Sequence, residues 1–204
     1  MFTGIITDVG TIDSVEQRGD LRATIRTAFD TSDVALGASI ACSGACLTVV
    51  DKGEGWFAVD LSAETVARTA PGRWQAGARL NLERAMKLGD ELGGHIVAGH
   101  VDGIGTVAAI EPQGDSLRIT VSTDRSIAPY LAAKGSVTLD GISLTVNTVE
   151  DSADAVAFGI NIIPHTAAVT TFGQLEAGDA VHIEIDILAR YLGRMEQVRH
   201  VYQS

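Results

Sequence analysis

An internal duplication constrains the fold of this 204-residue chain more than any other feature. Residues 44–49 (GACLTV) return as residues 141–146 (GISLTV), and further matched pairs keep their order along both halves. The offset grows only from 95 residues near the start of each copy to 101 near its end. Solenoids and propellers repeat every ~20–50 residues, so each copy is predicted to be a domain. The predicted boundaries are 1–94 and 95–187, joined in the Gly-rich stretch 88–94, with 188–204 left as a tail.

Within each copy, apolar residues alternate with polar ones, which is the pattern of half-buried strands. Leu21, Ala23 and Ile25 show it in the first copy, and residues 117–121 show it in the second. Short strands separated by Gly and Asp turns predict an all-β protein with a small antiparallel barrel in each half. Further strands are predicted over residues 5–12, 39–50, 56–61 and 79–83, and over 100–107, 136–146, 156–162 and 180–187.

Two helices are predicted outside this pattern. A short one follows Ser126, which can cap it, and Pro129 is tolerated in its first turn. In the tail, apolar residues spaced 3, 4, 3 and 4 form a helical seam: Leu188, Tyr191, Met195, Val198 and Tyr202. Such a helix packs on its own barrel or self-associates. Self-association is favoured, because two complete barrels leave no core for it to join.

The composition excludes several classes of protein. A formal net charge of −11 with scattered basic residues argues against nucleic acid and anionic membranes as partners. The longest uncharged stretch, 34–50, is too short and too polar to span a bilayer, and the start has no basic signal-peptide region. A cytoplasmic protein is therefore expected. Cys42 and Cys46 would lie about 13 Å apart on an extended strand, so we expect free thiols and no zinc site.

Six segments together resemble one known family. They are residues 1–6 (MFTGII), 44–49 (GACLTV), 93–101 (GGHIVAGHV), 134–136 (KGS), 140–146 (DGISLTV) and 163–166 (IPHT). In this order, within the duplication, they resemble riboflavin synthase of the alpha-chain type over essentially the whole chain. The resemblance implies two six-stranded Greek-key barrels, each binding one 6,7-dimethyl-8-ribityllumazine, and a homotrimer held by carboxy-terminal helices.

The resemblance also implies the reaction, the final step of riboflavin biosynthesis. Two lumazines exchange a four-carbon unit to give riboflavin and 5-amino-6-ribitylamino-pyrimidinedione. One ring loses a methyl proton, and C7 of the other is attacked by a nucleophile. No cofactor or metal is expected, because carbons and electrons pass between the two substrates. Holding the two rings together can lower the barrier by about 7–11 kcal/mol.

The resemblance groups the substrate-binding residues around two lumazines. The first set is Thr3, Gly4, Ile5, Ile6, Leu47, Thr48, Asp60, Leu61, Ser62, Ala63, Glu64 and Thr65, alongside Cys46. The second set is Gly99, Val101, Leu144, Thr145, Asn161, Ile162, Ile163, Pro164, His165 and Thr166, alongside His100 and Ser143, with Lys134 as a charged contact. Small polar residues such as Thr3, Ser39 and Thr48 stand where a plain core would carry Val or Ile, which is consistent with a polar ligand.

Five residues are candidates for the chemistry: Cys46, His100, Ser143, Asp186 and Ser39. Cys46 is the sharpest difference between the copies, because Ser143 takes its place; it is either the nucleophile or a polarisable wall that positions water. His100 can exchange protons near neutral pH. Asp186 is expected to cap the terminal helix and also to reach the reacting pair, by a hydrogen bond to Ser143 or water. A joint metal role with His95 is excluded if residues 95–100 form a strand, because the two rings would then face opposite sides.

Two other functions remain as alternatives. A non-catalytic lumazine- or flavin-binding antenna protein has the same double barrel, but such carriers tend to lose the polar residues of one pocket. Small Greek-key barrels also bind oligonucleotides. An acidic chain with 5% aromatic residues lacks the stacking platforms and positive grooves that this requires.

Overall fold

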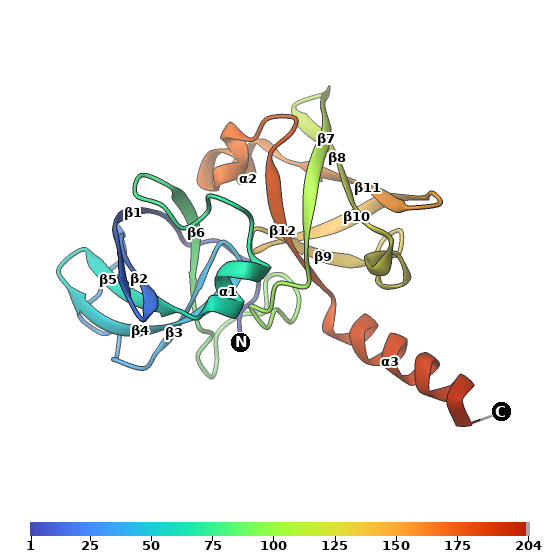
Figure 1. The fold of residues 1–204 in the computed structure, drawn as a ribbon. Coiled ribbons are helices and arrows are strands. Elements are labelled where there is room, and N and C mark those ends of the chain that lie inside the picture. The colour runs from blue at the N-terminus through green and yellow to red at the C-terminus, as the bar shows by residue number, and fades with distance from the viewer. Residues whose placement is uncertain (203–204) are drawn as a thin grey trace.

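Residues 1–202 are described by the computed structural model, and their strands close into two six-stranded antiparallel barrels (Figure 1). The first barrel contains β1 (Asp8–Arg18), β2 (Asp20–Arg26), β3 (Ser39–Cys42), β4 (Ala45–Gly53), β5 (Trp56–Leu61) and β6 (Arg79–Arg84). The second contains β7 (Gly103–Gln113), β8 (Ser116–Asp124), β9 (Ser136–Leu139), β10 (Ile142–Asp151), β11 (Ala155–Ile162) and β12 (Ala180–Ile185). The cyclic order β1-β2-β5-β4-β3-β6 recurs as β7-β8-β11-β10-β9-β12. The duplication and the all-β double barrel are therefore confirmed.

Two predicted strands are in fact hairpins. Residues 39–50 divide into β3 and β4 around Ser43 and Gly44, whose φ angles are 44° and 83°, and residues 136–146 divide in the same way at Asp140 and Gly141. Positive φ at both central residues is the geometry of a two-residue hairpin turn. Cys42 and Ala45 pair across the first turn and share a face, so the alternation shifts by one residue there. The prediction of a single strand over residues 39–50 missed this shift.

The hairpin also changes the interpretation of the cysteines. Both thiols are free, as expected. However, Cys42 and Cys46 lie on adjacent strands, so the separation of an extended chain does not apply. The Cys42 side chain is fully buried in the first core, whereas Cys46 is half-exposed. Cys46 is therefore the accessible thiol of the two.

Each barrel encloses its own apolar core. Phe57, Leu61 and Leu80 are fully buried in the first, and Phe158 and Ile183 are buried in the second. These side chains come from the apolar positions of alternating strands, and each contributes about 1.5–3 kcal/mol through burial.

Short helical segments follow the strands. The helices α1 (Ala63–Arg68) and α2 (Pro164–Val169) follow β5 and β11, and 3-10 turns lie at η1 (Arg125–Tyr130) and η2 (Thr171–Gln174). Six residues are too few to show a helical period, so α1 and α2 were not predicted. The predicted helix at Ser126 is the 3-10 turn η1, and its cap is Asp124, whose side chain accepts the Ser126 N–H; Ser126 as the cap is wrong.

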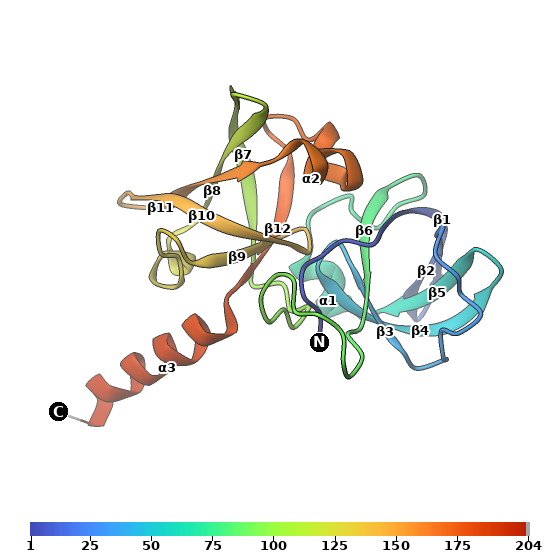
Figure 2. The same ribbon diagram turned by 180° about the vertical axis from the view of Figure 1, so that it is seen from behind.

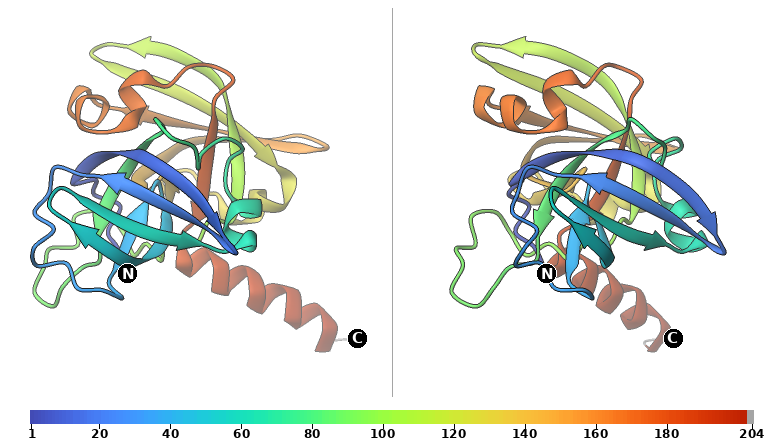
Figure 3. Two further views of the ribbon diagram at one scale, coloured as in Figure 1. Left: turned by 60° about the vertical axis from the view of Figure 1, so that its left-hand side comes forward. Right: turned by 90° about the vertical axis from the view of Figure 1, so that its left-hand side faces the viewer.

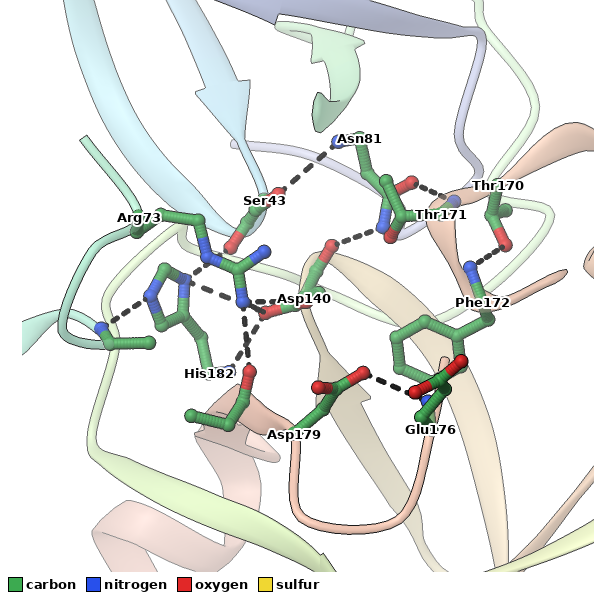
Figure 4. Close-up of polar contacts among 12 residues, drawn as sticks. Ser43, Arg73, Asn81, Asp140, Thr170, Thr171, Phe172, Glu176, Asp179 and His182 are labelled. Atoms are coloured by element: carbon green, nitrogen blue, oxygen red, sulfur yellow. Dashed lines mark hydrogen bonds and ion pairs between the residues drawn. The ribbon is translucent and has the colours of Figure 1, made fainter. Parts of the chain in front are cut away.

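The barrels meet turn against turn. A Cβ atom on Gly44 would lie 2.8 Å from the Gly141 nitrogen, so only glycine allows this approach. Around the turns lies a polar network (Figure 4). The Asn81 side chain donates to the Asp140 carbonyl and accepts the Thr171 N–H. Its equivalent in the second repeat, His182, hydrogen-bonds the Ser43 carbonyl through Nδ1 and accepts the Ala70 N–H through Nε2. Each barrel therefore holds the other in the same way.

Helix α3 (Ile187–Tyr202) projects away from both barrels (Figures 1 and 3). A bidentate ion pair between Arg190 and Asp102 ties its first turns to the second barrel. Leu188, Tyr191 and Met195 of the predicted seam are 65–69% exposed. The side chains of Tyr202 and His200 lie outside the described residues. Among the described helices, none is long and apolar enough to cross a membrane.

Candidate active site

The site is built by two segments that cross between the barrels (Figure 2). Phe2 and Val97 pair in antiparallel fashion through N···O hydrogen bonds of 2.7 and 3.1 Å. Residues two positions further along each segment therefore lie on opposite sides of this pairing. Gly99 reaches the first barrel, where its carbonyl accepts the Cys46 N–H at 2.8 Å. Gly4 reaches the second barrel, where its carbonyl accepts the Ser143 N–H at 2.8 Å.

This crossing corrects the predicted grouping of the residues. Residues 4–6 were expected beside Cys46 and residues 99–101 beside Ser143, because each was assigned to its own repeat. The structure exchanges the two segments. Ile6, for example, packs against the core of the second barrel. The exchange follows from the antiparallel pairing of Phe2 with Val97, for which the sequence pattern gave no signal.

The first site is a hollow of about 190 Å³ at the end of the first barrel. Its lining is Ala45, Cys46, Glu64, Thr65, Arg68, Gly99, His100 and Val101. It brings the half-exposed Cys46 thiol close to the exposed His100 imidazole of the other repeat. Gly99 is required here, because its φ is +80° and a Cβ would lie 2.5 Å from the Cys46 Cβ.

The other residues predicted for the first site have distinct surroundings. Asp60 forms a bidentate ion pair with Arg22, at 2.7 and 2.9 Å, and Ser62 caps α1 by accepting the Thr65 N–H. The Leu47 and Leu61 side chains lie in the barrel core, while Thr48 and Ala63 are exposed. Ser39 is the strand partner of Thr48 and is half-buried. The polar groups thus line the rim of the barrel and the apolar ones fill it.

The second site contains a serine–histidine pair. The Ser143 Oγ lies 2.7 Å from Nδ1 of His95, and Nε2 of this ring lies 3.2 Å from the Thr138 Oγ1. In the tautomer with hydrogen on Nε2, Nδ1 accepts the Ser143 hydroxyl hydrogen. Burial lowers the pKa of His95 below 6.5, and the Asp186 charge only partly opposes this. The ring is therefore neutral at pH 7 and able to accept a proton.

Sequence reasoning missed His95 as a site residue. It placed residues 95–100 on a strand and considered this ring only as a metal ligand. The segment is not a strand apart from the bridge at Val97. The His95 N–H donates to the Thr3 carbonyl, so this residue follows the crossing segment to Ser143. Among the described residues, no three His, Cys, Asp or Glu side chains gather as a metal site.

Asp186 has one of its two expected roles. Its Oδ1 accepts the Leu188 N–H at 2.9 Å, which makes it the amino-terminal cap of α3, as predicted. The Ser143 hydroxyl bonds to His95 instead of Asp186. The Asp186 charge acts to raise the pKa of His95, against the effect of burial. The expected contact of Asp186 with a bound water stays a prediction.

The other residues predicted for the second site lie on β10, on β11, at the start of α2 and before β9. Thr145 is the strand partner of Ser136, and Asn161 donates to the Gln113 side chain at the barrel rim. Ile163, Pro164 and His165 are exposed at the start of α2, Thr166 is half-buried, and the Ile162 side chain lies in the core. Leu144 packs against that core. Lys134 is exposed, with a left-handed φ of 69° and its N–H on the Val146 carbonyl.

The two sites are equivalent in position but different in chemistry. Cys46 and Ser143 hold the same place in their hairpins, and the crossing segments present His100 to the first site and its equivalent, Ile5, to the second. His95 stands only at the second. The structure thus offers two related sites with different acid–base groups.

Comparisons with known proteins agree with this architecture. The lumazine-binding domain matches residues 3–85 and again residues 98–186. Crystal structures of LumP with 6,7-dimethyl-8-(1'-D-ribityl) lumazine and with riboflavin each superpose with a TM-score of 0.76. They share 24% and 23% identity and cover 90–91% of this chain and 98–99% of theirs, which shows a common fold. The fold and site therefore define a tandem lumazine-binding double barrel.

Curated relatives narrow this class. Riboflavin synthase of Brucella abortus (strain 2308) is 49% identical over 203 residues, covering 97% of this chain and 98% of the relative. That of Bacillus subtilis (strain 168) is 41% identical over 196 residues, covering 95% and 89%. The chain belongs to the riboflavin synthase family.

Proposed function

We propose that this protein catalyses the dismutation of two 6,7-dimethyl-8-ribityllumazine molecules to riboflavin and 5-amino-6-ribitylamino-pyrimidinedione. The observation that carries the proposal is the pair of equivalent but chemically different sites, in a chain of the riboflavin synthase family. Because the two reactants are the same molecule in different roles, two related pockets with different acid–base groups suit them. The products together contain all the atoms of the two substrates, so the reaction is balanced without a further reactant.

The second site carries the group best suited to move a proton. The neutral His95 ring accepts the Ser143 hydroxyl hydrogen, and the serine oxygen in turn takes a proton from the methyl group of the bound lumazine. Asp186 stabilises the charge that His95 gains. At the first site, Cys46 is a polarisable wall beside C7 of the other ring, and His100 exchanges protons there.

The substrate contacts follow the rims of the two barrels. We assign one lumazine to residues 46–48, 60–65 and 99–101, and the other to residues 143–145, 161–166 and 4–6, with Lys134 as the charged contact. The side chains of Leu47, Leu61 and Ile162 lie in the barrel cores, so these residues contact the substrate through their backbone atoms. Proximity supplies much of the acceleration, since effective molarity contributes about 7–11 kcal/mol.

The active assembly is a cytoplasmic homotrimer. Its supporting observation is α3, which leaves Leu188, Tyr191, Leu192 and Met195 exposed along a helix that projects from the barrels. Apolar side chains at this spacing suit packing against copies of the same helix.

Turnover of the lumazine tests the function directly. The full-length chain is mixed with 6,7-dimethyl-8-ribityllumazine in buffer with a metal chelator, and riboflavin is followed by absorbance and by chromatography. We expect one riboflavin for every two lumazines consumed. Tight binding without product would reject the synthase and support a chromophore carrier, the activity that the likeness to LumP makes the second candidate.

A further inference from the structure

The crossing segments need an anchor, because each must hold its position inside the other repeat's barrel. The segment that carries Gly99 and His100 lies outside the strands of both barrels. The Gly99 carbonyl accepts the Cys46 N–H, but the N–H groups of Gly99 and His100 do not point toward Cys46. The group that accepts these N–H hydrogen bonds therefore fixes the position of the Gly99–His100 segment, which forms the wall of the first site.

A single buried carboxylate accepts the N–H groups of three consecutive residues, Ala98, Gly99 and His100. Glu184, on β12, is 4% exposed. Its Oε1 accepts the Ala98 N–H at 2.7 Å, and its Oε2 accepts those of Gly99 and His100 at 3.0 and 3.1 Å. A carboxylate has about four acceptor positions, so it can satisfy three converging donors where an amide side chain cannot. Hydrogen bonds to an ionised acceptor are also about twice as strong as neutral ones.

The same device recurs in the first repeat. Glu83, on β6, is 5% exposed and stands 101 positions before Glu184. Its Oε1 accepts the Thr3 N–H and hydroxyl, each at 2.7 Å, and its Oε2 accepts the Gly4 N–H at 2.9 Å. Gly4 is the residue that meets Ser143. Each carboxylate therefore holds its own repeat's segment in the site of the other repeat.

The environment of Glu184 makes its ionised form costly. Burial raises its pKa from 4.5 to about 7, and the nearby Asp102 charge adds to this rise, against the effect of the three N–H bonds. Asp102 itself is held by Arg190 of α3 and accepts the Ile185 N–H. A neutral side chain at position 184 would avoid the cost but leave backbone donors without partners.

We propose that Glu184 and Glu83 are the positioning residues of the two substrate sites: Glu184 sets the Gly99–His100 wall of the Cys46 site, and Glu83 sets the Gly4 wall of the Ser143 site. The use of riboflavin as the ligand in the test below rests on the proposed function. Glu184→Gln keeps the size of the side chain but turns an amide N–H₂ toward at least one backbone N–H. The wall beside Cys46 then moves, while the Ser143 site keeps its anchor.

Alkylation of Cys46 reports on this wall specifically, because Cys42 is fully buried. The full-length chain is treated with iodoacetamide, without and with increasing riboflavin, and modified Cys46 is measured by mass spectrometry. In Glu184→Gln we expect alkylation without ligand to be about threefold faster or more. We also expect riboflavin to protect Cys46 only at about tenfold higher concentration, equivalent to ~1.4 kcal/mol of binding.

The matched variant is Glu83→Gln, which should leave both Cys46 readouts within about twofold of the wild type while lowering turnover. Glu150→Gln, at an exposed position of β10, controls for the loss of one charge and should change nothing. If Glu184→Gln does not fold, as judged by circular dichroism, Glu184→Asp replaces it, because it keeps the charge but withdraws the carboxylate by one methylene.

Two results would overturn the positioning role. One is a Glu184→Gln chain whose Cys46 alkylates and is protected like the wild type. The other is an equal effect of Glu83→Gln on Cys46, which would indicate a general loosening of the fold. The alkylation rate without ligand needs no flavin, so it tests the positioning role even if the wild-type chain fails to turn over lumazine, a failure that would count only against the proposed function.

Discussion

At the scale of single residues, the two sites differ most in their histidines. His95 is half-buried and bonded to Ser143, whereas His100 is exposed beside Cys46. Burial that lowers the pKa of His95 makes it a base at neutral pH, and general base catalysis contributes about 10²–10⁴-fold. This difference, rather than the overall fold, distinguishes the two sites.

His95→Asn is predicted to lower kcat about 100-fold or more while changing riboflavin affinity less than about threefold. The reason is that the amide can keep a hydrogen bond to Ser143 but cannot accept a proton. Ser143→Ala should cost a similar factor. Because the two residues act as one unit, the double variant should be no slower than either single variant. Steady-state kinetics with the lumazine measure all three, and effects that multiply would contradict the pair.

At the scale of elements, α3 stands out because its Leu188, Tyr191, Leu192 and Met195 side chains are exposed in the single chain. Its contacts with its own barrel include the Arg190–Asp102 ion pair and the approach of Gly193 and Gln197 to Tyr130. Exposed apolar side chains gathered on one helix are typical of an interaction site.

Removal of residues 188–204 is predicted to convert the assembly to monomers and to reduce turnover, as measured by light scattering after size exclusion and by riboflavin formation. Truncation also removes Arg190, so Met195→Glu is the matched variant: it keeps the ion pair with Asp102 but places a charge in the apolar face. We expect it to dissociate the assembly as well. A monomeric variant with full activity would reject the trimer as the active assembly.

At the scale of the whole molecule, a buried polar network joins the two barrels (Figure 4), beside an apolar cluster of Phe2, Ala41 and Val97. His182 belongs to it only as a neutral ring, because Nε2 accepts the Ala70 N–H while Nδ1 donates to the Ser43 carbonyl. Burial lowers its folded-state pKa below the ordinary 6.5, against the opposing effect of Asp140. The unfolded chain therefore takes up this proton more readily than the folded chain.

The sign of the pH effect follows from this difference. The stabilisation by His182 is complete above about pH 6.5 and declines as the pH falls below that value toward the folded-state pKa. His182→Asn, which copies Asn81, is predicted to cost about 1–3 kcal/mol at pH 7.5. The difference in unfolding free energy between the wild type and this variant should shrink by pH 5.5, as measured by urea denaturation. A difference that stays constant over this range would show that His182 does not titrate in this way.

The sequence by itself determined the duplication, the strand-rich barrels and the family, because these depend on local alternation and on short segments that recur in order. It also indicated the equivalence of Cys46 with Ser143 and the capping role of Asp186, both of which are local properties. Only the tertiary structure decided which segment serves which site. The antiparallel pairing of Phe2 with Val97 joins residues 95 positions apart, and it carries Gly99 to Cys46 and His95 to Ser143. Contacts of this kind depend on how two folded barrels meet, and no pattern within either repeat encodes them.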